Sequence, residues 1–269
     1  VDLIEDFASA IPVEVIGNLF VMPHEERGPL RDWSLAILGA LEPTLTPEQH
    51  ERGNRAVTEF KAYLADLAAR RRKHPGDPAT DVLTRLMAGN EGEELSDVEL
   101  LQNCIFILNA GHETTTNLIG NALHELIKWP DEARRLRGNP DLIDTAVDEF
   151  LRFQSPNQLG NRMTTQAVEF HGEEIEAGTR IHLCIGAANR DPRRYDNPDV
   201  LDLGRKPNRH LAFAQGPHLC AGFSLARMEG RIAISRLLAR FPNYQLSGPA
   251  TRTGRVRFRG FSHLPARVN

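Results

Sequence analysis

The sequence predicts a mainly α-helical protein with a small β element. Apolar residues recur at helical spacing over most of residues 1–151 and again over residues 222–241, whereas strand-like patterns are short and confined to the remainder. The chain has 269 residues, of which 41% are hydrophobic and 25% charged, and this is enough to bury a sizeable core. We find no linker that divides two units, so we expect a single domain over residues 1–269.

Three helices are expected in the first quarter of the chain. Residues 3–19 place their apolar side chains on one face, and residues 25–38 follow with a second helix. The third helix begins after Thr46, which occupies the N-cap with Gln49 at the capping-box position, and it extends to the basic residues that end at Lys73.

A helix of about 30 residues is expected after Ser96, which has Glu99 at the capping-box position. Its apolar residues lie on nearly every side until Trp129, so we expect this helix to cross the interior of the molecule. A shorter helix follows Pro140 and ends near Ser155.

The β element begins after this helix. Residues 167–172 and 179–183 read as short strands around a turn at 176–178. An irregular stretch over residues 189–208 leads to the last helix, 222–241, and short strands are expected from Tyr244 onward.

Composition argues against several classes of protein. The net charge of −4 gives no positive field for nucleic acid or an anionic membrane, and no apolar run approaches the roughly 18 residues of a membrane span. No targeting segment is visible, and three scattered cysteines make no disulfide framework, which fits a cytoplasmic protein. The chain starts at Val1 within an amphipathic pattern, so we expect the numbering to begin inside a longer protein.

The segment 213–222, Phe-Ala-Gln-Gly-Pro-His-Leu-Cys-Ala-Gly, carries the strongest chemical indication. Cys220 lies at the entrance of a predicted helix, where backbone N–H groups favour the thiolate, a metal ligand. Gly216 and Gly222 allow the backbone to approach a flat ligand, and His218 can bond an anionic group at its edge. A single cysteine taken alone is more often an inert buried residue.

The long helix carries the second indication, Ala110-Gly111-His112-Glu113-Thr114. The hydroxyl of Thr114 can bond the carbonyl of Ala110 one turn earlier, which loosens the helix and opens a groove beside Gly111. A carboxylate such as Glu113 and a neighbouring hydroxyl can together relay protons. The alternative is a polar, solvated helix face, which fits poorly with the apolar surroundings.

These segments resemble the cytochrome P-450 superfamily of haem-thiolate monooxygenases. Its cysteine loop reads Phe-x-x-Gly-x-His/Arg-x-Cys-x-Gly, and all five fixed positions match here. The resemblance implies haem b with Cys220 as the axial iron ligand, His218 on a haem propionate and Phe213 beside the sulfur. Many members have Gly where Ala214 stands, so a slightly tighter turn is expected.

The resemblance also assigns roles to residues outside the loop. Glu113 and Thr114 match the acid–alcohol pair that delivers protons. Glu149 and Arg152, spaced for an ion pair, match the family's Glu-x-x-Arg helix. Two further residues and one segment fit the family's pattern. Arg205 matches the third member of this architectural cluster, Arg162 falls where a guanidinium contacts a propionate, and residues 157–160 fall where part of the substrate pocket lies.

The implied reaction inserts one atom of O2 into a small organic substrate. Electrons would come from a separate ferredoxin or flavodoxin-type protein with an NAD(P)H-dependent reductase, docking near Lys206, Arg209 and Arg227. The matched segments correspond to the middle and C-terminal parts of the family, so the N-terminal third is expected to be missing. An alternative is a haem-poor or haem-free fragment that acts as a binding module.

Other chemistries fit the sequence less well. A zinc hydrolase is disfavoured because Asn117 stands where a His-Glu-x-x-His motif would need its second histidine. No phosphate-binding glycine loop or nucleophile elbow is present. Cys104 and Cys184 are expected to be small core residues.

Overall fold

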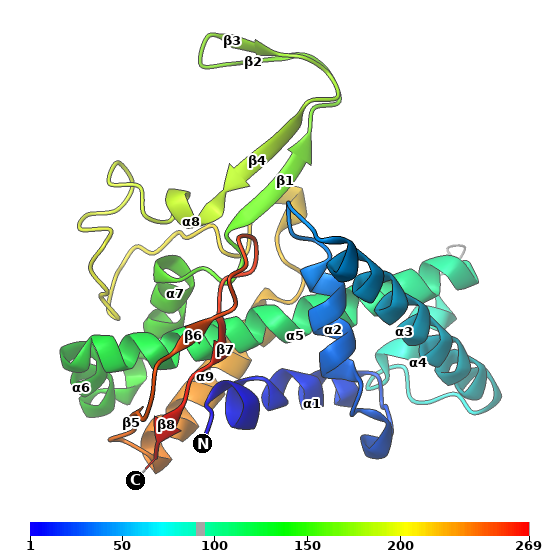
Figure 1. Cartoon of the computed structure of the whole chain (residues 1–269), viewed down its shortest axis with the longest axis horizontal. Coiled ribbons are helices and arrows are strands. Elements are labelled where there is room, and N and C mark those ends of the chain that lie inside the picture. Colours follow the sequence, from blue (N-terminus) through cyan, green and yellow to red (C-terminus); the bar gives the residue numbers. More distant parts are fainter. Residues whose placement is uncertain (90–94, 269) are drawn as a thin grey trace.

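The computed structural model describes residues 1–89 and 95–268, and it confirms the mainly α-helical class with a small β element. The long helix α5 (Asp97–Lys128) runs through the body, with other helices packed along it (Figure 1). Its predicted capping box is present: the backbone N–H of Glu99 donates to the Ser96 hydroxyl, and the Glu99 carboxylate accepts from the backbone N–H of Ser96. Seventeen of its residues are buried, in keeping with a helix that crosses the interior.

The N-terminal helices differ from the expectation at their starts. The expected helix 3–19 is divided into a π-helical turn η1 (Ile4–Ala8) and α1 (Ala10–Leu19), because the N–H of Ser9 bonds the carbonyl of Ile4 five residues earlier. A 3₁₀ turn η2 (His24–Glu26) precedes α2 (Leu30–Gly39), which begins later than predicted.

The two helices that follow illustrate how capping sets helix boundaries. Helix α3 (Pro47–Lys73) has the Thr46 and Gln49 capping box that the sequence predicted. Helix α4 (Val82–Ala88) was not predicted; the Asp81 side chain caps it by accepting from two backbone N–H groups.

Beyond α5 the chain folds back along it. A helix that the sequence analysis missed, α6 (Pro130–Gly138), begins at the proline that ends α5. A 3₁₀ turn η3 (Pro140–Leu142) then leads into α7 (Ile143–Phe153), the expected shorter helix.

The central strands form an arm that stands away from the body (Figure 1). Strand β1 (Leu159–Met163) pairs antiparallel with β4 (Arg180–Cys184), and β2 (Val168–Phe170) pairs with β3 (Glu173–Ile175). The sequence located β2 and β4 but missed β1 and β3. The two located strands therefore pair with other partners and not with each other around the turn at 176–178.

The chain then returns to the body through α8 (Ile185–Ala188), an irregular stretch and a 3₁₀ turn η4 (Gly216–His218). Helix α9 (Phe223–Arg240) packs against α5 and α7, as expected for the last helix. The C-terminal strands form two more antiparallel pairs, β5 (Gln245–Leu246) with β8 (Ala266–Arg267) and β6 (Thr251–Arg252) with β7 (Phe261–His263).

Two apolar clusters share α5. Leu118 and Leu123 pack with residues of α7 and α9, whereas Leu100 and Leu108 pack with residues of α1 and α3. Full burial of each such leucine contributes about 1.5–3 kcal/mol, so the helix is stabilised along its whole length. This double role explains why apolar residues surround it.

The free cysteines divide between core and surface. Cys104 is buried in the second cluster, as expected, but the same expectation for Cys184 is wrong. Cys184 is exposed because it lies on β4, in a two-stranded sheet that stands away from the body. In the part of the chain that the structure describes, no helix is long and apolar enough to cross a membrane.

Candidate active site

The Cys220 loop is a compact turn that ends where α9 begins. The backbone N–H of Cys220 donates to the carbonyl of Phe213 at 2.9 Å, and the N–H of Leu219 donates to the carbonyl of Gly216 at 3.0 Å. The carbonyl of Cys220 in turn accepts from the N–H of Phe223, the first residue of α9. These bonds hold an exposed thiol directly before a helix N-terminus.

Phe213 anchors this loop to the protein interior. Its ring packs against the first apolar cluster and lies 5.7 Å from the His210 ring and 6.3 Å from the Phe223 ring. The guanidinium of Arg227 lies over the same ring at 4.9 Å. The next residue, Ala214, has a φ of 58°, a left-handed conformation that costs an L-residue about 1–2 kcal/mol.

The glycines leave the outer side of the loop clear. Gly216 has a φ of 67°, and a Cβ built there would meet no atom within 4 Å. A Cβ on Gly222 would lie 4.0 Å from Cys220 Sγ, an ordinary van der Waals contact, so this glycine lies directly beside the sulfur. His218, between the two glycines, is exposed.

Helix α5 separates the residues of its motif onto different faces. Ala110 is exposed, and the hydroxyl of Thr114 donates to its carbonyl at 2.8 Å, the bond that the sequence suggested. The sequence predicted an open groove beside Gly111, but Ile16 of α1 lies there instead. A Cβ built on Gly111 would lie 2.9 Å from Ile16 Cδ1. The missing side chain of Gly111 therefore allows α1 to pack closely against α5.

Glu113 points into the interior and is only 2% exposed. Arg255, from the segment between β6 and β7, donates from Nη1 to both carboxylate oxygens at 2.6 Å and from Nη2 to the carbonyl of Leu35 on α2 at 2.9 Å. Burial raises the pKa of Glu113 to about 7, although the guanidinium of Arg255 acts in the opposite direction. Glu113 is thus a carboxyl group that can gain or lose a proton near neutral pH.

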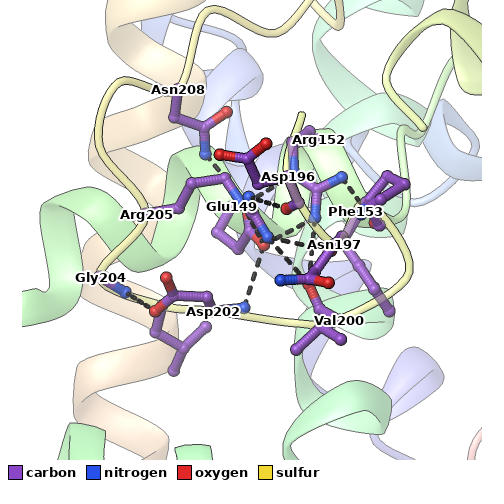
Figure 2. Close-up of polar contacts among 12 residues, drawn as sticks. Glu149, Arg152, Phe153, Asp196, Asn197, Val200, Asp202, Gly204, Arg205 and Asn208 are labelled. Atoms are coloured by element: carbon purple, nitrogen blue, oxygen red, sulfur yellow. Dashed lines mark hydrogen bonds and ion pairs between the residues drawn. The ribbon is translucent and has the colours of Figure 1, made fainter. Parts of the chain in front are cut away.

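Glu149, Arg152 and Arg205 form one buried network (Figure 2). Glu149 and Arg152, both 0% exposed, make two bonds of 2.7 Å, and Arg205 Nε lies 3.1 Å from Glu149 Oε1. Arg152 Nη1 also donates to the carbonyls of Asn189 and Pro198 at 2.9 Å. The network therefore ties α7 to the irregular stretch that leads to the Cys220 loop.

Arg162 lies on β1 with its side chain exposed, and its Nη1 donates to the carbonyl of Asn161 at 2.7 Å. Residues 157–160 begin the same arm, and the N–H of Gln158 donates to the carbonyl of Arg257. No carboxylate pairs with Arg162 among the described residues, so its guanidinium is free to bind an anionic group.

The chain matches the family description "Cytochrome P450" over residues 35–248, most of its length. It is 39% identical to the biotin biosynthesis cytochrome P450 of Bacillus subtilis (strain 168), over 91% of this chain and 62% of that protein. It is also 39% identical to cytochrome P450 107B1 of Saccharopolyspora erythraea, over 99% of this chain and 65% of that protein.

This chain belongs to the cytochrome P450 family. The crystal structure of P450BioI in complex with hexadec-9Z-enoic acid ligated acyl carrier protein superposes on 100% of the chain with a TM-score of 0.95 and 37% identity. The superposition covers 69% of that structure, and the chain spans less than two thirds of the length of both relatives above. Cytochrome P450 proteins bind haem through a cysteine thiolate.

The residues present fit a haem group. Within residues 1–89 and 95–268, no group of three or more His, Cys, Asp or Glu side chains could hold a metal ion by itself. The exposed thiol of Cys220, held before the N-terminus of α9, suits an iron whose other ligands come from a porphyrin. Gly216 and Gly222 leave the space beside this thiol free of side chains, and His218 and Arg162 are exposed cation or donor groups for its propionates.

Two residues of this cytochrome P450 chain escaped the sequence analysis. Arg255, the partner of Glu113, is 142 positions away in the sequence, so no local pattern links them. Glu229 is buried on α9, and burial raises its pKa to about 7. Its place on the apolar face of the predicted helix 222–241 could have indicated that Glu229 is buried.

Proposed function

We propose that the protein is a haem-thiolate monooxygenase that inserts one oxygen atom of O2 into a small organic substrate. In this proposal residues 1–269 are the middle and C-terminal parts of a single haem-binding domain. The observation that carries it is the Cys220 loop, an exposed thiol held by backbone bonds at the entrance of α9. Cys220 would bind the haem iron through its thiolate, and the residues that would contact the porphyrin are Phe213, Gly216, His218, Gly222 and Arg162.

Bound haem would supply the binding and activation of dioxygen, and the protein would control protons and position. Thr114 Oγ1 can exchange its bond to the Ala110 carbonyl for one with a group on the exposed face of α5. Glu113, with a pKa near neutrality, can take up a proton and pass it on. Since Arg255 binds both of its oxygens, the Glu113 carboxylate must turn away from this guanidinium to reach the Thr114 side.

Electrons would come from a separate ferredoxin or flavodoxin-type donor with an NAD(P)H-dependent reductase. Lys206, Arg209 and Arg227 flank the Cys220 loop in sequence and offer positive charge to such a partner. Arg227 is partly neutralised by Asp148, whose carboxylate accepts from its Nε at 2.7 Å. Glu149, Arg152 and Arg205 would hold the loop and take no part in the chemistry.

The ferrous–CO spectrum of the purified chain supplied with haem tests this proposal. We expect a strongly red-shifted Soret band in the wild type and in the Cys184→Ser variant, because Cys184 is the other exposed free cysteine and lies on the arm. The Cys220→Ser variant should lose the band while its far-ultraviolet circular dichroism is unchanged. A band that survives Cys220→Ser would rule out the ligand assignment, and no haem band at all would favour the haem-free binding module.

A further inference from the structure

The end of the chain is strongly basic although the protein as a whole is acidic. The net charge of the chain is −4, yet residues 230–269 contain eight arginines and no Asp, Glu or Lys. These arginines are Arg231, Arg236, Arg240, Arg252, Arg255, Arg257, Arg259 and Arg267. Such a concentration of one sign creates a positive local field wherever acidic groups of the fold do not neutralise it.

The fold compensates only part of this charge. Arg231 pairs with Asp144 at 2.6 Å, and Arg255 pairs with Glu113 at 2.6 Å. Within the described part of the chain, Arg252 and Arg259 have no carboxylate oxygen within the 4.0 Å of a salt bridge.

Both of these arginines line one open pocket of about 560 Å³. The pocket lies between the base of the β1–β4 arm and the segment that contains β6 and β7, two regions that meet in Figure 1. Its walls include a third guanidinium, that of Arg255, and no carboxylate side chain among the described residues. Because Glu113 neutralises Arg255, the uncompensated charge of the pocket comes from Arg252 and Arg259.

Arg252 is held in a defined position. Its Nη1 donates to Asn121 Oδ1 at 3.0 Å, and its guanidinium lies 3.8 Å from the centre of the Phe261 ring. Burial lowers the pKa of Arg252, and the positive charge of Arg259 lowers it further, whereas the negative charge of Glu125 has a smaller effect in the opposite direction. The two guanidiniums therefore repel each other across a partly desolvated wall, which favours an anion between them.

We propose that this pocket is a binding site for a small anionic ligand, with Arg252 and Arg259 as its two cationic contacts. The ligand would carry a phosphate or carboxylate group, since both accept hydrogen bonds from the fork of a guanidinium. Arg259 is exposed and can close over the ligand, whereas Arg252 is already fixed by Asn121 and Phe261. Gln158 and Leu159, which also line this pocket, belong to the segment expected to form part of the substrate pocket, so the two sites adjoin; anion binding can be measured without haem.

Isothermal titration calorimetry of the full chain at constant ionic strength tests the proposal, with inorganic pyrophosphate and succinate as separate probes. We expect saturable binding of at least one probe with one site per chain, and the stronger probe identifies phosphate or carboxylate as the preferred group. Arg259→Gln should weaken binding at least tenfold without affecting the fold, because its side chain is exposed. Arg252→Gln should have a similar effect, and Arg252→Lys should retain part of the affinity.

Arg240→Gln is the matched control, because Arg240 also lies over an aromatic ring, that of Phe241, and has no carboxylate partner among the described residues. The Arg240→Gln variant should bind both probes with the same affinity as the wild type. Absence of saturable binding by both probes would overturn the proposal. An equal loss in Arg240→Gln and Arg259→Gln would do so too, because it would show attraction to the overall basic surface.

Discussion

Glu113 and Thr114 are neighbours in sequence, but each has its own environment on α5. Thr114 bonds within the helix beside the exposed Ala110, and Glu113 is buried against Arg255. Arg255 also bonds the carbonyl of Leu35, so one guanidinium links the α5 carboxylate to α2. Burial raises the pKa of Glu113, and a residue from the C-terminal segment, Arg255, limits that rise.

Replacing Arg255 should change how stability depends on pH. The pKa of Glu113 in the folded protein, about 7, lies above its ordinary value of 4.5, so its contribution to stability is fully present below about pH 4.5 and is lost as pH rises to about 7. In Arg255→Gln the pKa of Glu113 rises further, because a cation that lowered it is gone. The variant should therefore lose more stability at pH 8 than at pH 5, by up to about 1.4 kcal/mol, because the wild-type pKa lies only about one unit below pH 8.

Urea unfolding of the wild type and the variant at the two pH values measures this difference. Glu229 contributes its own pH dependence, but it does so in both proteins and cancels. In a Glu113→Gln background the effect of Arg255→Gln should no longer depend on pH. Equal destabilisation at pH 5 and pH 8 in the original background would contradict the assignment.

At the scale of elements, the Cys220 loop retains a strained residue. Ala214 has a left-handed backbone with a φ of 58°, which Gly adopts without a Cβ clash. Ala214→Gly should therefore stabilise the protein by up to about 1 kcal/mol after the entropy of Gly is subtracted. Differential scanning calorimetry measures this as a higher Tm.

Ala221→Gly, in the same loop, serves as the control. Ala221 is not among the residues with positive φ, so glycine there relieves no strain and should lower stability by about 0.5–1 kcal/mol. A lower Tm for Ala214→Gly would show that backbone strain at this position does not destabilise the protein.

The Glu149 network should dominate the stability of the irregular stretch. Arg152→Ala would leave the buried Glu149 with a weaker set of partners and free the carbonyls of Asn189 and Pro198. We expect a loss of about 3–5 kcal/mol in the free energy of unfolding. Arg231→Ala, which breaks the exposed pair with Asp144, should cost far less because solvent screens that pair. Similar losses in the two variants would refute the structural role.

Local signals predicted the helices better than the strands. Thr46 and Ser96 gave the starts of α3 and α5 because capping is decided within four residues. Strand β3 lies next to β2 in the sequence, but its residues Glu173 and Glu174 give no apolar strand pattern. The partner of β4 was not predicted, because its pairing with β1 joins residues about 20 positions apart. For the same reason the sequence suggested Glu113 and Thr114 as a pair, but it gave no indication of Arg255.

At the scale of the whole molecule, α5 divides the protein into two apolar clusters and brings the motif residues to its midpoint. On one side Ala110 and Thr114 reach the exposed face, and on the other Glu113 meets Arg255. The Cys220 loop is positioned separately, through Phe213 in the first cluster and through the Glu149 network. Because these supports come from distant parts of the chain, the proposed site depends on the whole fold.

The most direct measurement is anomalous diffraction at the iron edge from crystals of the chain reconstituted with haem. We expect a single iron peak at bonding distance from Cys220 Sγ, with the porphyrin between the Cys220 loop and the face of α5 that carries Ala110 and Thr114. Iron located away from Cys220, or a Cys220 side chain turned from the metal with another residue as its ligand, would contradict it.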